Sequence, residues 1–224
     1  MNTITLAVLD MAGTTVSDEG VVEQAFADAY NATRVMRAYG SEADVRAYAI
    51  STMGQSKIEV FSHLTSSSPD AIAANFAFEA AYSNLIAAGA CTAIPGIVDT
   101  FARMRSANIS IVLTTGFSKR TQNALIDHLG WAPLIDAALC PADAGRGRPF
   151  PDLNLTAVLR TRTVSVADML VAGDTASDIL SATRAGAGRS VGVLTGAYTE
   201  QQLREAGASD ILASAAELPA LLGI

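Results

Sequence analysis

The chain has 224 residues and a formal net charge of −7, and half of its residues are hydrophobic. This length suits one α/β domain with an insertion, and this composition excludes a chain that is disordered as a whole. The acidic balance argues against nucleic acid and anionic membranes as partners, and no apolar run approaches the ~20 residues that cross a bilayer. Cys91 and Cys140 are too few for a disulfide framework, so we expect a cytoplasmic protein.

The N-terminal part of the chain predicts one strand followed only by helices. Residues 4–9 form an apolar run with the length of a buried strand, and a turn of small residues follows from Asp10. Asp18 is the N-cap candidate of the first helix, and Met53-Gly54 interrupts the second. The helices expected from apolar spacing cover residues 18–39, 45–64 and 69–88.

From residue 95 onward, helices and strands alternate. The expected helices cover 95–107, 118–129 and 152–160, with further helices from 177 and at the C-terminal end. The expected strands cover 109–114, 137–140, 169–172, 190–194 and 211–212. Such alternation predicts a parallel sheet with helices on both faces.

We therefore expect an α/β fold in two parts. Residues 1–16 and 92–224 form a Rossmann-like core, and residues 17–91 form an all-helical insertion. In parallel sheets of this kind, ligands bind at the carboxyl ends of the strands. The insertion leaves the core at that same edge, so it should form a cap domain over the site.

Polar side chains collect where the expected strands end. Asp10 follows the first strand, Thr115-Gly116 follows the second, and Gly173-Asp174-Thr175 follows a later one, with Asp178 close behind. Arg148 lies in a loop between them. Carboxylates, hydroxyls, small residues and a cation suit a phosphoryl group together with Mg²⁺, which prefers hard oxygen ligands. A carboxylate can also attack phosphorus and form an aspartyl-phosphate.

These motifs resemble the four motifs of the haloacid dehalogenase superfamily of hydrolases. They are Asp10-x-x-Gly13-Thr14, the strand that ends in Thr115, Arg148-Pro149, and Gly173-Asp174-x-x-x-Asp178. The order of the motifs and the inserted cap agree with that family. Where the family usually has Asp-x-Asp and a lysine, this chain has Asp10-Met11-Ala12 and Arg148. Both features are similar to the phosphonatase branch, which contains phosphonoacetaldehyde hydrolase.

The resemblance implies a role for each motif residue in a Mg²⁺-dependent hydrolase. Asp10 would be the nucleophile and a metal ligand, and Asp174 the second carboxylate ligand. The carbonyl of Ala12 would complete the protein's share of the metal shell, and Asp178 would orient metal-bound water. The phosphoryl oxygens would be held by Thr14, Thr115, the Gly116 N–H group and Arg148, with Thr115 and Arg148 also assisting catalysis. Arg146 is the alternative to Arg148.

Ala12 has a chemical consequence, since it cannot protonate a leaving group. In phosphonatase, a lysine of the cap forms a Schiff base with the substrate aldehyde and accepts the electrons of the C–P bond. The segment Met53-Gly54-Gln55-Ser56-Lys57-Ile58 is similar to the stretch that carries this lysine. We therefore expect Lys57 to be that amine. The alternative is a solvated lysine on a cap helix.

Two departures keep other functions open. The phosphonatase lysine is followed three residues later by a histidine, which is Val60 here, and the tyrosine after the Thr-Thr-Gly stretch is Phe117 here. The first alternative is therefore a phosphatase acting on a small phosphate monoester, and the second is a non-catalytic module that binds a phosphorylated ligand. A small phosphonate or phosphate is the expected partner, and a homodimer is compatible with this branch. His63 is interpreted as structural or exposed, and His128 as a residue near a helix C-terminus that suits the helix dipole and needs no catalytic role.

Overall fold

The computed structural model describes residues 3–17 and 19–224, which form an α/β fold around a six-stranded parallel sheet. The strand order is β5-β4-β1-β6-β7-β8, so the first strand of the chain lies inside the sheet. The strands are β1 (Leu6–Asp10), β4 (Ser110–Thr114), β5 (Ala137–Leu139), β6 (Met169–Gly173), β7 (Arg189–Val193) and β8 (Asp210–Leu212).

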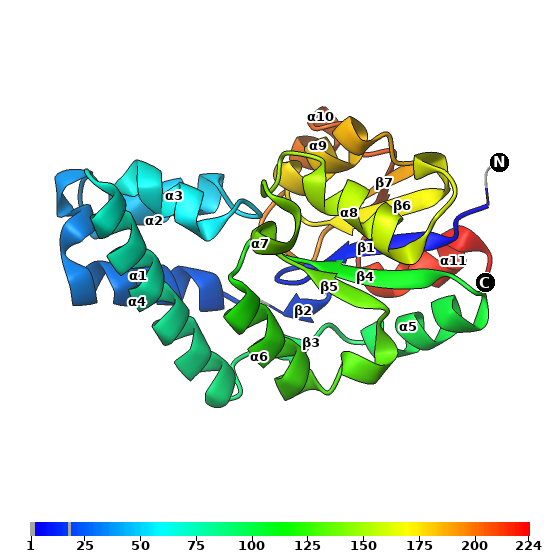
Figure 1. The fold of residues 1–224 in the computed structure, drawn as a ribbon, viewed down its shortest axis with the longest axis horizontal. Coiled ribbons are helices and arrows are strands. Elements are labelled where there is room, and N and C mark those ends of the chain that lie inside the picture. Colours follow the sequence, from blue (N-terminus) through cyan, green and yellow to red (C-terminus); the bar gives the residue numbers. More distant parts are fainter. Residues whose placement is uncertain (1–2, 18) are drawn as a thin grey trace.

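Helices cover both faces of this sheet (Figure 1). Ala7 and Leu9 of β1 pack on one side with α5 (Ile97–Ser106), α6 (Lys119–Leu129) and α11 (Leu218–Leu222). Leu6 and Val8 pack on the other side with α8 (Asp152–Thr161) and α9 (Ala176–Ala185). Because successive residues of a strand point to opposite faces, one apolar run supplies both hydrophobic cores.

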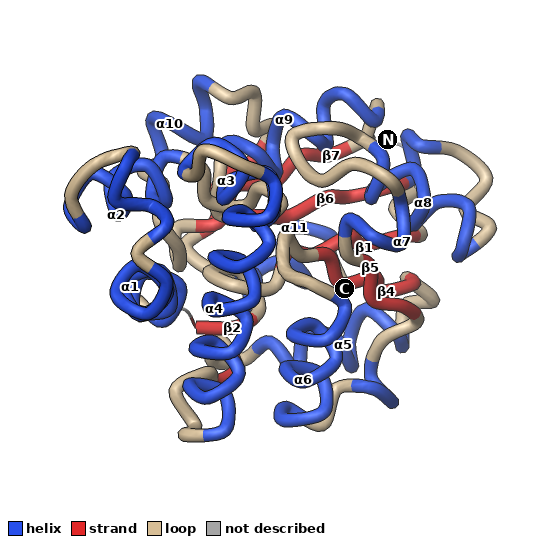
Figure 2. Tube along the Cα trace, turned by 60° about the vertical axis from the view of Figure 1, so that its left-hand side comes forward, coloured by secondary structure: helices blue, strands red, loops and turns tan. Residues whose placement is uncertain are grey.

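The helical insertion forms a separate lobe beside the carboxyl ends of the strands (Figures 1 and 2). Its helices are α1 (Val21–Thr33), α2 (Glu42–Ser51), α3 (Lys57–Leu64) and α4 (Ser68–Ala87). Phe26, Phe61 and Phe78 pack against one another with ring centroids 4.9–5.8 Å apart. The lobe leaves the core after β2 (Val16–Ser17) and returns at β3 (Thr92–Ala93), which pair in antiparallel fashion.

The predicted fold class is confirmed, and the differences concern short elements. β2, β3, α7 (Pro141–Ala144) and α10 (Glu200–Glu205) are too short to produce a periodic pattern. The remaining short elements are 3₁₀ helices at Val35–Ala38, Ala132–Leu134, Val166–Asp168 and Ala215–Glu217.

The first helix was predicted too early in the chain. Helix α1 begins at Val21 after Gly20, whose left-handed conformation ends the preceding turn, and Asp18 lies outside the described residues. The division of the chain at residues 17 and 91 stays a prediction. None of the helices within the described residues is long and apolar enough to cross a membrane.

Candidate active site

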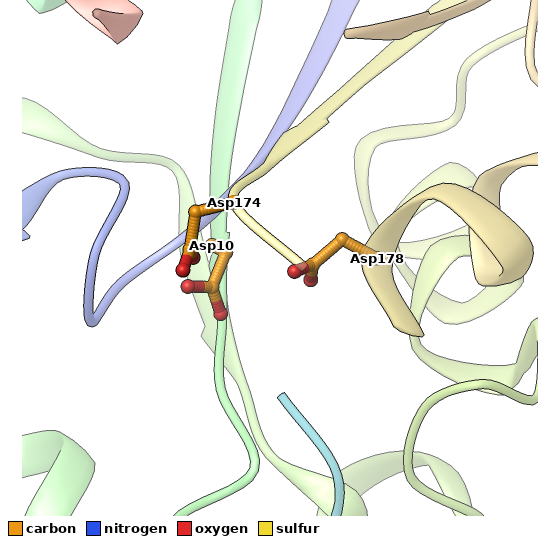
Figure 3. A group of neighbouring side chains, drawn as sticks. All are labelled: Asp10, Asp174 and Asp178. Carbon is orange, nitrogen blue, oxygen red and sulfur yellow. The ribbon is translucent and has the colours of Figure 1, made fainter. Parts of the chain in front are cut away.

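Three buried carboxylates meet at the carboxyl edge of the sheet. Asp10 ends β1, Asp174 follows β6, and Asp178 lies in the first turn of α9. Each offers an oxygen within 4.8 Å of the others. Figure 3 shows Asp10 and Asp174 together at the strand ends, with Asp178 reaching toward them from its helix. The structure thus brings together the three aspartates that the sequence predicted.

Arg148 is the cation of this cluster. Its Nη1 lies 2.6 Å from Oδ1 of Asp10 and also pairs with Asp178. The guanidinium is buried, and its Nε has no hydrogen-bond partner within residues 3–17 and 19–224. Arg146 is directed elsewhere: it binds the carboxylate of Asp152 at 2.8–2.9 Å and lies over the ring of Phe150. Of the two candidate arginines, the structure therefore places Arg148 at the carboxylates.

Within the described residues, the groups that donate hydrogen bonds to Asp174 are neutral. Its oxygens accept hydrogen bonds from the Thr14 hydroxyl at 3.1 Å and from the Ala197 N–H group at 3.0 Å. Burial, followed by the negative charge of Asp10, raises the pKa of Asp174 to about 7. The neighbouring side chains therefore compensate the negative charge of the buried carboxylates only in part. Thr14, predicted to bind phosphate, has its hydroxyl on this carboxylate.

Asp178 has two roles in the structure. Its Oδ2 accepts hydrogen bonds from the backbone N–H and the hydroxyl of Thr175, at 3.1 and 2.5 Å, and so caps helix α9. Its other oxygen pairs with Arg148. The start of helix α9 therefore fixes the position of the Asp178 carboxylate, and this carboxylate in turn fixes the position of the Arg148 guanidinium.

Lys57 is contributed to the site by helix α3 of the cap. It lines a cavity of about 30 Å³ together with Asp10, Ala12, Arg148 and Asp174. Only 5 % of Lys57 is exposed, and its Nζ lies 5.8 Å from the ring centre of Phe26 and 5.5 Å from that of Phe117. Lys57 is therefore not a solvated surface lysine.

The segment before Lys57 is pressed against the core. The backbone N–H group of Lys57 donates to the carbonyl of Gly116 at 3.1 Å. A Cβ atom on Gly116 would lie 2.1 Å from the carbonyl oxygen of Gln55, so the backbones are too close for any side chain there. Thr115 and Gly116 line the same cavity, and the Thr115 hydroxyl accepts a hydrogen bond from the Phe117 N–H group.

The two departures from the phosphonatase pattern are both buried. Val60 packs inside the cap, and Phe117 lies beneath Lys57 and against Tyr82. Neither side chain can transfer a proton. His63 is exposed and stacks on Tyr48, in agreement with its structural interpretation.

The loop after β7 is a part of the site that the sequence did not predict. Thr195 donates to the carbonyl of Gly13 at 2.7 Å, Ala197 holds Asp174, and Tyr198 donates to the Ser51 carbonyl of the cap. A Cβ atom on Gly196 would lie 1.9 Å from Oδ2 of Asp174. The sequence could have indicated this loop by its position, since a turn of small and polar residues follows strand 190–194 as it follows the other strands.

The buried carboxylates fit a divalent cation. Their donors are hard oxygens, and Asp174 lacks a direct cationic partner among the described residues, while burial raises its pKa. Asp10, Asp174 and the Ala12 carbonyl are the groups that would hold Mg²⁺, with Asp178 beside them. A cation there would remove the electrostatic cost of ionising Asp174.

Comparison with known proteins gives a family match and distant relatives. A model described as haloacid dehalogenase-like hydrolase matches residues 4–186. A phosphonoacetaldehyde hydrolase of Hahella chejuensis is 26% identical over an aligned stretch of 152 positions, and the match covers 57% of this chain and 51% of that protein. This chain therefore spans about half the length of that protein, 34% of a second phosphonoacetaldehyde hydrolase, and 15% of a bifunctional phosphonoacetaldehyde hydrolase/aminoethylphosphonate transaminase.

Solved structures resemble the whole fold. A hydrolase from Pseudomonas syringae has a TM-score of 0.85 and 23% identity, and the match covers 98% of both chains. A phosphonoacetaldehyde hydrolase-like protein from Oleispira antarctica has a TM-score of 0.82 and 22% identity, covering 99% of this chain and 92% of that one. At these identities the structural likeness shows the arrangement of core and cap.

Proposed function

This chain belongs to the haloacid dehalogenase-like hydrolases, and on that premise we propose that it cleaves the C–P bond of phosphonoacetaldehyde or a related small phosphonate. One observation carries the proposal. The buried Lys57 of the cap lines the same small cavity as Asp10 and Arg148 of the core. An amine for the carbonyl end of the substrate thus shares a cavity with a carboxylate for its phosphorus end.

At the phosphorus end, Asp10 is the nucleophile. One of its oxygens forms a bond to phosphorus while the C–P bond breaks, which gives an aspartyl-phosphate. Arg148 pairs with Asp10 and lines the cavity, so its guanidinium would donate to a phosphoryl oxygen there. Thr115 and the Gly116 N–H group, which line the same cavity, would hold further phosphoryl oxygens. Mg²⁺ would supply positive charge that offsets the negative charge of the phosphoryl group.

At the carbonyl end, Lys57 converts the carbon group into one that can leave phosphorus with the electron pair of the C–P bond. Its amine condenses with the aldehyde and releases water, which leaves a protonated imine. The electron pair of the breaking C–P bond moves into this imine and forms an enamine. Protonation on carbon and addition of water then release acetaldehyde and return Lys57. Water finally cleaves the aspartyl-phosphate to free phosphate and Asp10. No acid is needed at Ala12 in this sequence.

Hydrolysis of a small phosphate monoester is the second candidate function. Val60 and Phe117 favour it, because neither side chain can transfer a proton as the family's histidine and tyrosine would at these positions. Lys57 would then be a cation that binds the substrate, and Asp10 would act as before. Ala12 weighs against this reaction, since an alkoxide leaving group needs an acid.

Phosphate release from phosphonoacetaldehyde separates the two candidates. We expect release that requires Mg²⁺ and falls by at least about 100-fold in Lys57→Arg, because a guanidinium cannot form the imine. Lys119→Arg changes the only other lysine of the chain and is the matched control. Borohydride with the aldehyde should add mass at Lys57 and inactivate the enzyme. Mg²⁺-dependent release from monoesters alone, without borohydride trapping, would establish the phosphatase instead.

A further inference from the structure

One wall of the candidate active site is a short segment of the cap. Met53, Gly54 and Lys57 line the cavity of about 30 Å³ that Asp10 and Arg148 line as well, and we call it the catalytic cavity. We call residues 53–57 the wall segment, which connects the end of α2 to the start of α3. Because the cavity is so small, the position of the wall segment relative to the core sets which substrates fit.

The carboxyl end of the wall segment is fixed by close backbone contacts. The Lys57 N–H group donates to the Gly116 carbonyl at 3.1 Å, and a Cβ atom on Gly116 would lie 2.1 Å from the Gln55 carbonyl oxygen. Gly54 is packed in the same way, since a Cβ atom there would lie 2.5 Å from Oγ1 of Thr175. These contacts hold the carboxyl half of the segment against the core and leave its amino end to another contact.

The amino end is held by a side chain of the core. The phenol of Tyr198 donates a hydrogen bond to the Ser51 carbonyl at 3.1 Å, and Ser51 is the last residue of α2, two positions before the wall segment. The last carbonyls of a helix have no amide partner within the helix, so they need donors from outside it. The ring of Tyr198 is partly buried and packs against the main hydrophobic core, which restricts where the hydroxyl group can lie.

The loop that carries Tyr198 is fixed to the core side of the site. Its Thr195 hydroxyl donates to the Gly13 carbonyl at 2.7 Å, and the Ala197 N–H group donates to Asp174 at 3.0 Å. Ala197 and Tyr198 are neighbours in the chain, so their Cα atoms lie about 3.8 Å apart. One loop thus holds a carboxylate of the core through its backbone and the cap through the adjacent side chain.

We propose that Tyr198 is a positioning residue for the wall segment: its hydroxyl group fixes the end of α2, and thereby the distance of Met53 and Lys57 from the carboxylates. Tyr198 is not among the described residues that line the catalytic cavity, so it acts through Ser51 and touches no reacting atom. The proposal rests on the proposed function, because it takes the catalytic cavity as the place of the reaction.

The two ends of a substrate should respond differently to the loss of this hydroxyl group. The phosphoryl end is held by residues of the core, whereas the carbon end meets the wall segment. Without the hydroxyl group the wall segment is held at one end only, so the carbon end should bind and react less well, while a free phosphate ion binds as before. A role in overall stability would instead weaken both, since both need the folded site.

Tyr198→Phe removes the hydroxyl group and keeps the ring. We expect kcat/KM for phosphonoacetaldehyde to fall by about three- to tenfold, the usual contribution of one hydrogen bond, while the affinity for inorganic phosphate, measured by calorimetry with Mg²⁺, stays within about twofold. Amide hydrogen exchange of residues 53–57 should accelerate by a similar factor, with unchanged rates in β1 and β6. Tyr30→Phe is the matched control, because it removes a phenol–carbonyl bond of 3.0 Å to Gly40 inside the cap and should change none of these quantities.

The outcomes separate this proposal from the proposed function. An unchanged kcat/KM in Tyr198→Phe, an equal fall in Tyr30→Phe, or an equal fall in the affinity for phosphate would overturn the role of Tyr198. Turnover of phosphonoacetaldehyde by the native enzyme would still support C–P cleavage in each case. If the native enzyme does not turn over this compound, C–P cleavage is overturned and hydrogen exchange decides the role of Tyr198. Faster exchange confined to residues 53–57 then supports that role, and unchanged or generally faster exchange overturns it.

Discussion

The two sides of the catalytic cavity are held in different ways. The core side, formed by Asp10, Arg148 and Asp174 with Asp178 paired to Arg148, is fixed by ion pairs and hydrogen bonds at the carboxyl edge of the sheet. The cap side, formed by the segment from Met53 to Lys57, is fixed by close backbone contacts and two aromatic rings. Changes on the core side should therefore affect the reaction itself, and changes on the cap side should affect which substrates react.

The strongest test of the core side is Asp10→Asn. An amide cannot attack phosphorus, so we expect turnover of every substrate to fall by at least about 10⁴-fold. Arg148 keeps Asp178 as a partner, so the variant should remain folded. Phosphate release and thermal unfolding measure the two effects. Full Mg²⁺-dependent turnover by this variant would contradict the nucleophilic role of Asp10.

Gly196→Ala tests whether the core side depends on close packing. The added methyl group would overlap Asp174, which must move or displace the loop after β7. We expect Mg²⁺ affinity and activity to fall by about 10–100-fold, as for other groups that orient a metal ligand. Gly89→Ala is the control: its backbone is left-handed but no atom lies within 4 Å of the added methyl group, so only stability should fall. Equal activity losses in both variants would refute the packing argument.

The pH dependence of stability should come from the core side. The pKa of Asp174 is about 7 in the folded protein and near 3.8 when exposed, so the folded state binds the proton more tightly. This contribution to the free energy of unfolding is fully present below pH 3.8 and is lost as pH rises through about 7. We expect a loss of a few kcal/mol in metal-free protein between pH 5 and 8.

Denaturant unfolding at several pH values, with Mg²⁺ and with chelator, checks this expectation. Mg²⁺ should oppose the loss, and its stabilising effect should grow as pH rises. Asp174→Asn is the control, because it removes the titrating group and should flatten the pH dependence. A stability that rises between pH 5 and 8 in the metal-free protein, and does so equally in the variant, would contradict this prediction.

The core side was largely predictable from the sequence, and the cap side was not. Asp10, Asp174 and Thr115 follow apolar runs, and parallel strands bring such residues to one edge. Whether Lys57 faces the site depends on Phe117 from the core and Phe26 from another helix, which no local pattern reports. Ala197 acts through its backbone N–H group, which every residue except proline has, so its side chain gives no signal.

Weakening the attachment of the cap to the core should have the smallest effect of these changes, and it compares the two sides of the cavity most directly. Glu79 of α4 accepts hydrogen bonds from Ser118 and Thr121 at the start of α6, so Glu79→Ala removes a link between cap and core. Because Glu79 is partly exposed, we expect a loss of only about 1–2 kcal/mol in unfolding free energy. Hydrogen exchange should accelerate at the first turn of α6, while the affinity for Mg²⁺ stays unchanged, since the carboxylates belong to the core.

The control is Glu59→Ala, which removes an exposed carboxylate on α3 and should leave both the hydrogen exchange of α6 and the Mg²⁺ affinity unchanged. A weakened Mg²⁺ affinity in Glu79→Ala would show that cap attachment also sets the geometry of the carboxylates, and the separation of the two sides would then fail.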